Sequence, residues 1–329
     1  MKVIYSRAPV RVCDIGGWTD TWFYKQGAVI NFCVDLYSYI RVVENNSNSI
    51  NIISENLDLN AKIKDYRQIE YDGILDLLKA AVKRMEIKSG LDIYARSDAP
   101  PSCGTGTSAS IAVALIGALS KFSDKYLSSY QIAELAHKLE TEELGLESGV
   151  QDQYAAAFGG INFMEINYPV VKISNIKVDN KRIFELESQM ILVYFGSRSS
   201  SEMHLQVIEN YKEGNESTIK AFDILKESAY EMVQAISSED IHEVGEIMNK
   251  NWEAQKALHS MMTPPIIKKT EKLAFQNGAI GFKCNGAGGG GSAVILAEKG
   301  CEYDLKKALL KEKLKLLPCK LNFKGLEIF

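Results

Sequence analysis

The sequence predicts an α+β fold divided into two domains. The first third of the chain is rich in β-branched and aromatic residues, which favour strands, whereas residues 202–259 show the apolar period of long amphipathic helices. A chain of 329 residues with 46% hydrophobic content can bury cores for two domains. We place the division where the pattern changes, which predicts domains at 1–175 and 176–329.

The first domain is expected to combine one sheet with several helices. Its strands are predicted, from β-branched content and partial alternation, at 2–9, 27–43, 49–54 and 91–96. Its helices are predicted, from their apolar period, at 72–85, 111–119 and 128–144, and an Ala-rich helical turn is predicted after Asp152, ended by Gly159-Gly160. The segment 11–21 between the first two strands is mixed in polarity, and we interpret it as an irregular loop.

The second half of the chain is expected to hold strands around a group of long helices. A strand pair is predicted at 170–178 and 189–195, and two further strands at 279–284 and 292–296. Thr263-Pro264-Pro265 opens a helix that Gly278 ends, because proline suits the first helical turn and glycine the position after the last. A Lys-rich helix over 303–316 and a strand over 320–329 are predicted at the end.

A glycine-containing loop separates the strand at 91–96 from the helix at 111–119. It reads Pro100-Pro101-Ser102-Cys103-Gly104-Thr105-Gly106-Thr107-Ser108-Ala109-Ser110. The two glycines let backbone N–H groups turn toward one point, and the first turn of a helix has unsatisfied donors at the positive end of its dipole. The loop therefore predicts an anion site, although a tight turn capped by Thr107 explains the same residues equally well.

Two further motifs stand near the ends of the chain. They are Arg7-Ala8-Pro9-Val10-Arg11-Val12-Cys13-Asp14-Ile15-Gly16-Gly17-Trp18-Thr19-Asp20 and Lys283-Cys284-Asn285-Gly286-Ala287-Gly288-Gly289-Gly290-Gly291-Ser292. Five glycines within six residues cannot pack as a strand core, so this backbone must approach something closely. In order and spacing the three motifs resemble those of the GHMP kinases, the superfamily of galactokinase, homoserine kinase, mevalonate kinase and phosphomevalonate kinase.

The resemblance spans nearly the whole chain and implies both fold and cofactors. It implies the GHMP kinase two-domain fold, with an N-terminal domain of the ribosomal protein S5 domain 2-like type and a ferredoxin-like C-terminal domain. It also implies ATP and Mg²⁺. The residues that match the family's ATP site are Pro101, Ser102, Cys103, Gly104, Thr105, Gly106, Thr107, Ser108, Gly288 and Gly289.

The same resemblance implies roles for polar side chains. Asp152 would face the acceptor hydroxyl, and Arg11 would be the cation beside the reacting groups. Ser108 and Glu140 would hold Mg²⁺. From the pattern alone, Asp152 also fits a helix N-cap and Glu140 a solvated helix surface. The implied substrate contacts are Asp20, Gly17, Trp18 and Gly286.

Aspartate beside glycine has a second explanation, because it commonly makes turns. This alternative applies to both Asp14 and Asp20, and we favour Asp20 as the functional residue.

Arg198 lies among serines where a strand is expected to meet a helix. It would bind the phosphate of a phosphorylated substrate, or it belongs to an ordinary capped helix start.

The sugar-kinase branch of the superfamily fits the substrate motifs. Gly16-Gly17-Trp18-Thr19-Asp20, and Gln151-Asp152-Gln153-Tyr154 before Phe158-Gly159-Gly160, resemble the D-glycero-D-manno-heptose phosphate kinases and, next, the fucokinase-type kinases. We therefore expect phosphorylation of an anomeric hydroxyl, with heptose 7-phosphate as first candidate and an unphosphorylated sugar as the alternative. Gly17 and Trp18 stand where galactokinases have Glu and His, which argues against galactose.

Two other function classes share these loops. A GHMP-fold decarboxylase is disfavoured by the sugar-like sequence around Asp152. A sugar sensor without catalysis would be expected to have lost Ser108, Glu140 or Asp152, and all three are present.

Composition limits the partners. A net charge of −4 and a pI near 5.8 leave no basic footprint, so neither nucleic acid nor membrane is expected, and the partners are ATP and a sugar or sugar phosphate. A charge follows the N-terminus at once, without a signal-peptide apolar region, so we expect a cytoplasmic protein. Six cysteines without CxxC spacing fit reduced thiols. The sequence leaves open whether the chain forms a homodimer.

Overall fold

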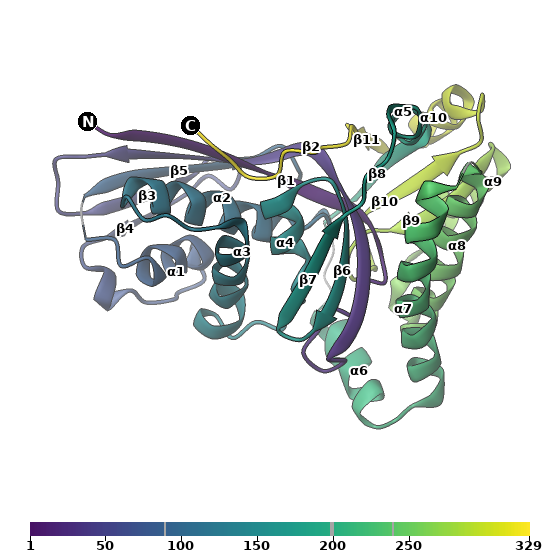
Figure 1. Ribbon diagram of the computed structural model, residues 1–329, viewed down its shortest axis with the longest axis horizontal. Coiled ribbons are helices and arrows are strands. Elements are labelled where there is room, and N and C mark those ends of the chain that lie inside the picture. The colour runs from purple at the N-terminus through teal and green to yellow at the C-terminus, as the bar shows by residue number, and fades with distance from the viewer. Residues whose placement is uncertain (89, 198–200, 239) are drawn as a thin grey trace.

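Two β-sheets organise the chain (Figure 1). The larger has the order β12-β1-β2-β5-β3-β4, with β6 paired to β2 and β7 to β6, and the smaller has the order β11-β8-β10-β9. The strands are β1 (Val3–Ile15), β2 (Gln26–Glu44), β3 (Ile50–Ser54), β4 (Leu59–Ile63), β5 (Leu91–Ser97), β6 (Ile161–Asn167), β7 (Val170–Asn175), β8 (Met190–Gly196), β9 (Ala279–Cys284), β10 (Gly291–Ala297), β11 (Lys315–Leu317) and β12 (Glu327–Ile328). This computed structural model describes residues 1–88, 90–197, 201–238 and 240–329.

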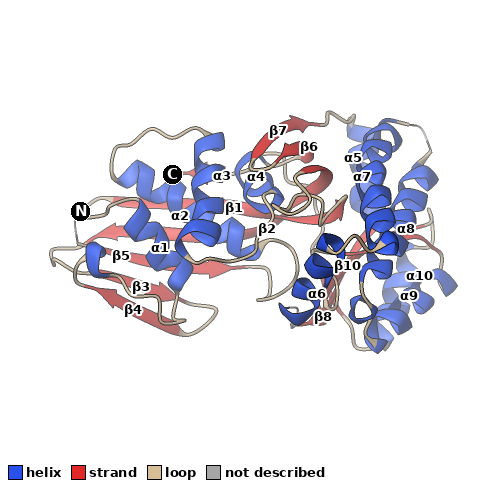
Figure 2. Ribbon diagram, turned by 90° about the horizontal axis from the view of Figure 1, so that it is seen from below, coloured by secondary structure: helices blue, strands red, loops and turns tan. Residues whose placement is uncertain are grey.

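Helices α1 to α4 lie on one face of the larger sheet, and α7 to α9 stand beside the smaller one (Figures 1 and 2). The helices are α1 (Asp76–Arg84), α2 (Thr107–Phe122), α3 (Ser129–Lys138), α4 (Gln151–Phe158), α5 (Asn180–Gln189), α6 (Ser201–Lys212), α7 (Glu216–Ser237), α8 (Ile241–Leu258), α9 (Pro265–Gln276) and α10 (Glu302–Lys311). A π-helical segment, η2 (Leu139–Glu143), continues α3, and short 3₁₀ turns lie at Tyr66–Gln68 and Ser260–Met262.

Three hydrophobic clusters hold the sheets and helices together. The first lies between the larger sheet and α2, whose residues from Ala112 to Leu119 are all buried. The second surrounds Trp252 and Phe282 and includes Trp18 from the loop after β1. The third joins the two sheets, because Met232 of α7 packs with residues of β1, β2, β8 and β10. The two halves therefore share a packed core.

Several predicted elements differ from the observed ones. Strand β1 runs to Ile15, so the predicted irregular loop at 11–21 begins only after it; bulges after Pro9 and Val12 keep this end paired with β2. The predicted pairing of 170–178 with 189–195 is wrong. Strand β7 instead pairs with β6, its neighbour across a two-residue connection, and β8 joins the other sheet.

The C-terminal prediction is also corrected. Helix α10 ends at Lys311, and Lys313 has a φ of 60°, which a continuing helix cannot accommodate. Of the predicted strand at 320–329 only β12 remains, because the chain before it runs along Cys33 and Gly160 and exchanges single hydrogen bonds with them. β12 pairs with β1, so the chain end returns to the first sheet.

Two global features bear on the expectations from composition. All six cysteines are free. In the ranges that the structure describes, no helix has both the length and the apolar character needed to cross a bilayer. The division of the chain at residue 175 stays a prediction.

Candidate active site

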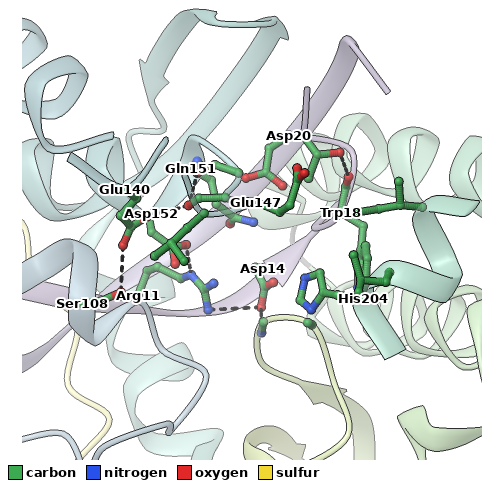
Figure 3. Close-up of a pocket in the computed structure, with 18 of the residues that line it drawn as sticks. Arg11, Asp14, Trp18, Asp20, Ser108, Glu140, Glu147, Gln151, Asp152 and His204 are labelled. Atoms are coloured by element: carbon green, nitrogen blue, oxygen red, sulfur yellow. Dashed lines mark hydrogen bonds and ion pairs between the residues drawn. The ribbon is translucent and has the colours of Figure 1, made fainter. Parts of the chain in front are cut away.

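A pocket of about 540 Å³ lies where the three motifs converge (Figure 3). Side chains reach it from the end of β1, the start of α2, η2, the start of α4, α6 and the loop after β9. Its labelled lining residues are Arg11, Asp14, Trp18, Asp20, Ser108, Glu140, Glu147, Gln151, Asp152 and His204. The backbone of Gly286 also borders it.

The loop before α2 is held in place through its carbonyl groups. Cys103 O accepts from Ser292 Oγ at 2.7 Å, Gly104 O accepts from Arg11 Nη1 at 2.5 Å, and Thr105 O accepts from Arg11 N at 3.0 Å. Over the described ranges, the N–H groups of Gly104, Thr105 and Gly106 donate to no acceptor. These donors precede a helix N-terminus and can bind an anion. Pro101, Ser102 and Cys103 precede these donors in the same loop, and Thr107 is the first residue of α2.

Two glycines give this loop its shape. Gly104 and Gly106 have φ of 80° and 72°, which side-chain-bearing residues rarely adopt. A Cβ on Gly106 would lie 3.0 Å from the carboxyl carbon of Asp152, so glycine allows the loop to approach that side chain. The predicted cap does not form, because Gly106 itself is the N-cap of α2 and no side chain caps the helix.

The C-terminal glycine motif packs onto the first loop. A Cβ on Gly291 would lie 2.6 Å from Cys103 O, and one on Gly104 would lie 2.8 Å from Asn285 O. Gly288 and Gly289 instead contact the turn after α8, where Gly289 N donates to Met262 O at 3.1 Å. Neither of these two lines the pocket, so their role toward a nucleotide stays a prediction.

Arg11 and Asp152 form a close pair. Arg11 Nε donates to Asp152 Oδ1 at 2.7 Å. Burial by itself lowers the Arg11 pKa, but the carboxylates of Asp152 and Asp14 outweigh it and raise that pKa. The Asp152 side chain is 26% exposed and so reaches the pocket. It stands one residue inside α4 and Val150 is the N-cap, so the N-cap interpretation is wrong.

Glu140 is buried within the π-helical segment. Its carboxylate accepts from Ser108 Oγ at 3.1 Å, Ser148 Oγ at 2.6 Å and Gln153 Nε2 at 2.8 Å. Burial raises the Glu140 pKa, and within the described ranges no cationic side chain forms an ion pair with it. The alternative of a solvated glutamate is therefore wrong. A buried carboxylate beside a hydroxyl, in need of a cation, fits Mg²⁺, which prefers hard oxygen ligands.

Two aspartates occupy the substrate side of the pocket. Asp20 Oδ2 accepts from Gln151 N at 3.1 Å, and burial, with the neighbouring Asp152 charge, raises the Asp20 pKa to about 6. Asp14 Oδ1 accepts from Gly286 N at 2.9 Å and lies 3.6 Å from Arg11 Nη1. Asp14 Oδ2 is buried without a hydrogen-bond partner.

An aromatic pair closes the far end of the pocket (Figure 3). The rings of Trp18 and His204 lie 4.5 Å apart, and Trp18 Nε1 is buried without a hydrogen-bond partner. Gly17 packs against the Asp14 carboxylate and does not line the pocket. Arg198 lies outside the described residues, so its contact with a substrate phosphate stays a prediction.

Sequence reasoning missed several lining residues. Asp14 was ranked below Asp20, although both lie in the same motif. Glu147 accepts a hydrogen bond from Trp22, and Ser148 supports Glu140. His204 has no ligand-like spacing in the chain, and only the packing of α6 brings it to Trp18. No local signal identifies such residues.

Comparisons with known proteins agree with this geometry. Residues 74–160 match the model of the GHMP kinases N terminal domain, and residues 232–315 match that of the GHMP kinases C terminal domain. A D-glycero-alpha-D-manno-heptose 7-phosphate kinase from Campylobacter jejuni is 30% identical over 95% of this chain and 94% of its own.

Two further relatives extend the comparison. An L-fucokinase/L-fucose-1-P guanylyltransferase from Bacteroides fragilis is 23% identical over 90% of this chain, which covers 35% of that larger protein. The crystal structure of a D-glycero-D-manno-heptose 1-phosphate kinase from Bacteroides thetaiotaomicron superposes with a TM-score of 0.82 at 27% identity, covering 99% of this chain and 98% of that one.

Proposed function

The chain belongs to the GHMP kinase superfamily and is an ATP-dependent sugar kinase, and from this premise we propose that it phosphorylates the anomeric hydroxyl of a heptose 7-phosphate. The relative at 30% identity over nearly the full length supports the choice of sugar. One observation of the pocket carries the proposal: the Arg11–Asp152 pair and the Ser108–Glu140 pair flank the same loop of free N–H donors.

Phosphoryl transfer needs in-line positioning and neutralisation of charge more than covalent chemistry from the protein. The loop N–H groups from Gly104 to Gly106 would bind the triphosphate of ATP. Ser108 and Glu140 would hold Mg²⁺, which when bound neutralises phosphate charge. Asp152 would orient the acceptor hydroxyl and take its proton, and Arg11 would hold that carboxylate in place.

The polarity of the wall suits a sugar. Carboxylates line the pocket together with Ser108 and Gln151. A sugar hydroxyl can both donate and accept hydrogen bonds, so the hydroxyls of a sugar match this wall better than an apolar ligand does. The exposed face of an aromatic ring also packs well against sugar C–H groups. We therefore place the acceptor sugar between Asp152 and Trp18.

The charge of the pocket favours an unphosphorylated sugar as the second candidate. The described lining carries carboxylates at five positions, Asp14, Asp20, Glu140, Glu147 and Asp152. Against them stand Arg11, already paired with Asp152, and the buried Lys283, which lies 3.7 Å from Asp14. A sugar phosphate group placed near Glu147 would meet unfavourable charge in the absence of another cation.

A coupled assay of ATP turnover with a panel of sugars tests the function. We expect ADP release that depends on sugar, is greatest with heptose 7-phosphate, and is lost in Asp152→Asn. Phosphorus NMR of the product identifies the anomeric phosphate. Preference for free fucose or mannose would select the second candidate, and turnover with neither would contradict a kinase and favour a sugar sensor. Arg198→Ala should raise KM only for the phosphorylated acceptor.

A further inference from the structure

The face of the larger sheet that points away from α2 carries arginine and tyrosine in alternation. On β1, Ser6 Oγ donates to Ala114 O of α2, so its neighbours Tyr5 and Arg7 point to the opposite side. Tyr5 pairs with Arg41 of β2, which pairs with Tyr94 of β5. Two residues along, the same strands place Arg7, Tyr39 and Arg96 in a second row. We call these six residues the Arg–Tyr face.

The arginines of the Arg–Tyr face are stacked on aromatic rings. The Arg41 guanidinium lies 4.0 Å from the ring centre of Tyr94, and that of Arg96 lies 3.9 Å from the ring centre of Tyr39. A stacked guanidinium is planar, permanently charged and fixed in orientation. Its remaining N–H donors are therefore arranged before any ligand arrives, which lowers the entropic cost of binding.

A cavity of about 410 Å³ lies on this face. All six residues of the Arg–Tyr face line it, together with Glu55 and the C-terminal Phe329. The side of the sheet that it occupies is not covered by α1 to α4 (Figures 1 and 2). Tyr5 is 52% exposed and Phe329 64% exposed, so two aromatic rings are accessible at its rim.

The cavity is positively charged in a chain that is negative overall. Three guanidiniums line it, and Glu55 is the one acidic side chain among its described lining residues. Arg7 is paired with Glu327 at 2.6 Å and Arg96 with Asp98 at 3.5 Å, but over the described ranges no carboxylate lies within 4 Å of Arg41. A ligand for this cavity therefore carries negative charge.

We propose that the Arg–Tyr face is a second ligand site that binds a small molecule in which a phosphate is joined to a planar ring, which is the chemistry of a nucleotide. Two N–H groups of one guanidinium can bind two oxygens of a phosphate at once. Over the described ranges, the charge of Arg41 is not neutralised by a carboxylate within 4 Å. The rings of Tyr5 and Phe329 offer stacking surfaces for a base. The site is separate from the kinase pocket, with which it shares no lining residue among those described.

Calorimetric titration of the full chain with GDP tests the proposal. The kinase pocket is first saturated with Mg²⁺ and a non-hydrolysable ATP analogue, so that only a second site can respond. We expect one equivalent of GDP to bind, and Arg41→Ala to weaken binding roughly 10- to 100-fold, the value of one charge-assisted hydrogen-bonded pair. Arg67→Ala is the matched control, because Arg67 is an exposed arginine paired with Asp65 outside this cavity.

Three results would overturn the proposal. They are the absence of GDP binding to the saturated protein, equal affinity of the Arg41→Ala and natural chains, and equal affinity for guanosine, which lacks the phosphate. A dimer that Arg41→Ala splits in sedimentation, without nucleotide binding, would instead make the face an interface between copies. Thermal melting without GDP verifies that Arg41→Ala is folded, and because this control needs no kinase turnover, the test stays independent of the proposed function.

Discussion

The pocket proposed to bind ATP and sugar, called here the kinase pocket, and the Arg–Tyr face differ in how deeply their charged side chains are buried. The pocket buries its carboxylates, as with Glu140 at 6% exposure and Asp20 at 3%, and each is held by several hydrogen bonds or a neighbouring charge. The Arg–Tyr face leaves Arg41 and Arg96 exposed; both are stacked on tyrosine rings, and Arg96 also lies 3.5 Å from Asp98. Because electrostatic effects grow as water is excluded, substitutions in the pocket should have the larger consequences.

The largest effect is expected from Asp152→Asn. An amide cannot take the proton of the acceptor hydroxyl, and it weakens the pairing with Arg11 at 2.7 Å. Loss of a general base lowers kcat by roughly 10²- to 10⁴-fold. Steady-state kinetics with saturating sugar and ATP measure it, and an unchanged melting temperature serves as the control. A kcat within threefold of the natural chain would show that Asp152 has no part in the chemistry.

Glu140→Gln is expected to come next. The variant keeps most of the volume and an oxygen for Ser108, but it removes the charge that would hold Mg²⁺. We expect activity at limiting Mg²⁺ to fall about 10- to 100-fold and to recover partly as Mg²⁺ is raised. Glu142→Gln, on the same helical segment but paired with Arg84 at the surface, is the matched control. Equal Mg²⁺ dependence in both variants would contradict the metal role.

Asp20→Asn should change stability with pH. Asp20 holds its proton more tightly in the folded protein, at a pKa of about 6, than at its ordinary value of 3.8. Its contribution to stability is therefore full below about pH 4 and is lost as the pH rises through 6. The asparagine variant should be more stable than the natural chain at pH 7, by up to about 3 kcal/mol, and little changed at pH 4.

Urea unfolding of the ligand-free proteins at both pH values measures the Asp20 effect. Asp124→Asn, an exposed aspartate paired with Lys2, should show no comparable gain. The Asp20→Asn variant should also raise KM for the sugar if Asp20 contacts hydroxyls. Equal stability of the natural and variant chains at pH 7 would show that the pocket does not raise the pKa of Asp20.

The smallest effect belongs to the exposed face. Arg96→Ala removes the stack on Tyr39 and a 3.5 Å contact with the half-exposed Asp98. Exposed contacts of this kind are worth about 0.5–1 kcal/mol. Urea unfolding of Arg96→Ala measures the loss. A cost above about 2 kcal/mol would mean that this face is as tightly coupled to its surroundings as the pocket, and the comparison would fail.

Local chemistry in the sequence was enough to place the loops. Gly104 and Gly106 sit at positive φ, and Gly291 approaches the first loop at Cys103, because glycine alone tolerates those conformations and contacts. The apolar periods of the helices are likewise set by neighbouring residues, and the order of the three motifs is read directly from the sequence. The family, the two-domain α+β fold and the kinase activity follow from these features together.

Tertiary structure decided burial, pairing and charge. Arg11 meets Asp152 across 141 positions, and whether Glu140 was solvated or buried depended on the turn of η2 toward Ser108. The partners of β7 and β8, and the Trp18–His204 contact, were likewise set by non-local packing. The neighbours of a residue in the sequence do not determine how deeply its side chain is buried or which distant groups it contacts. Its contacts and its pKa are therefore fixed only when the chain folds.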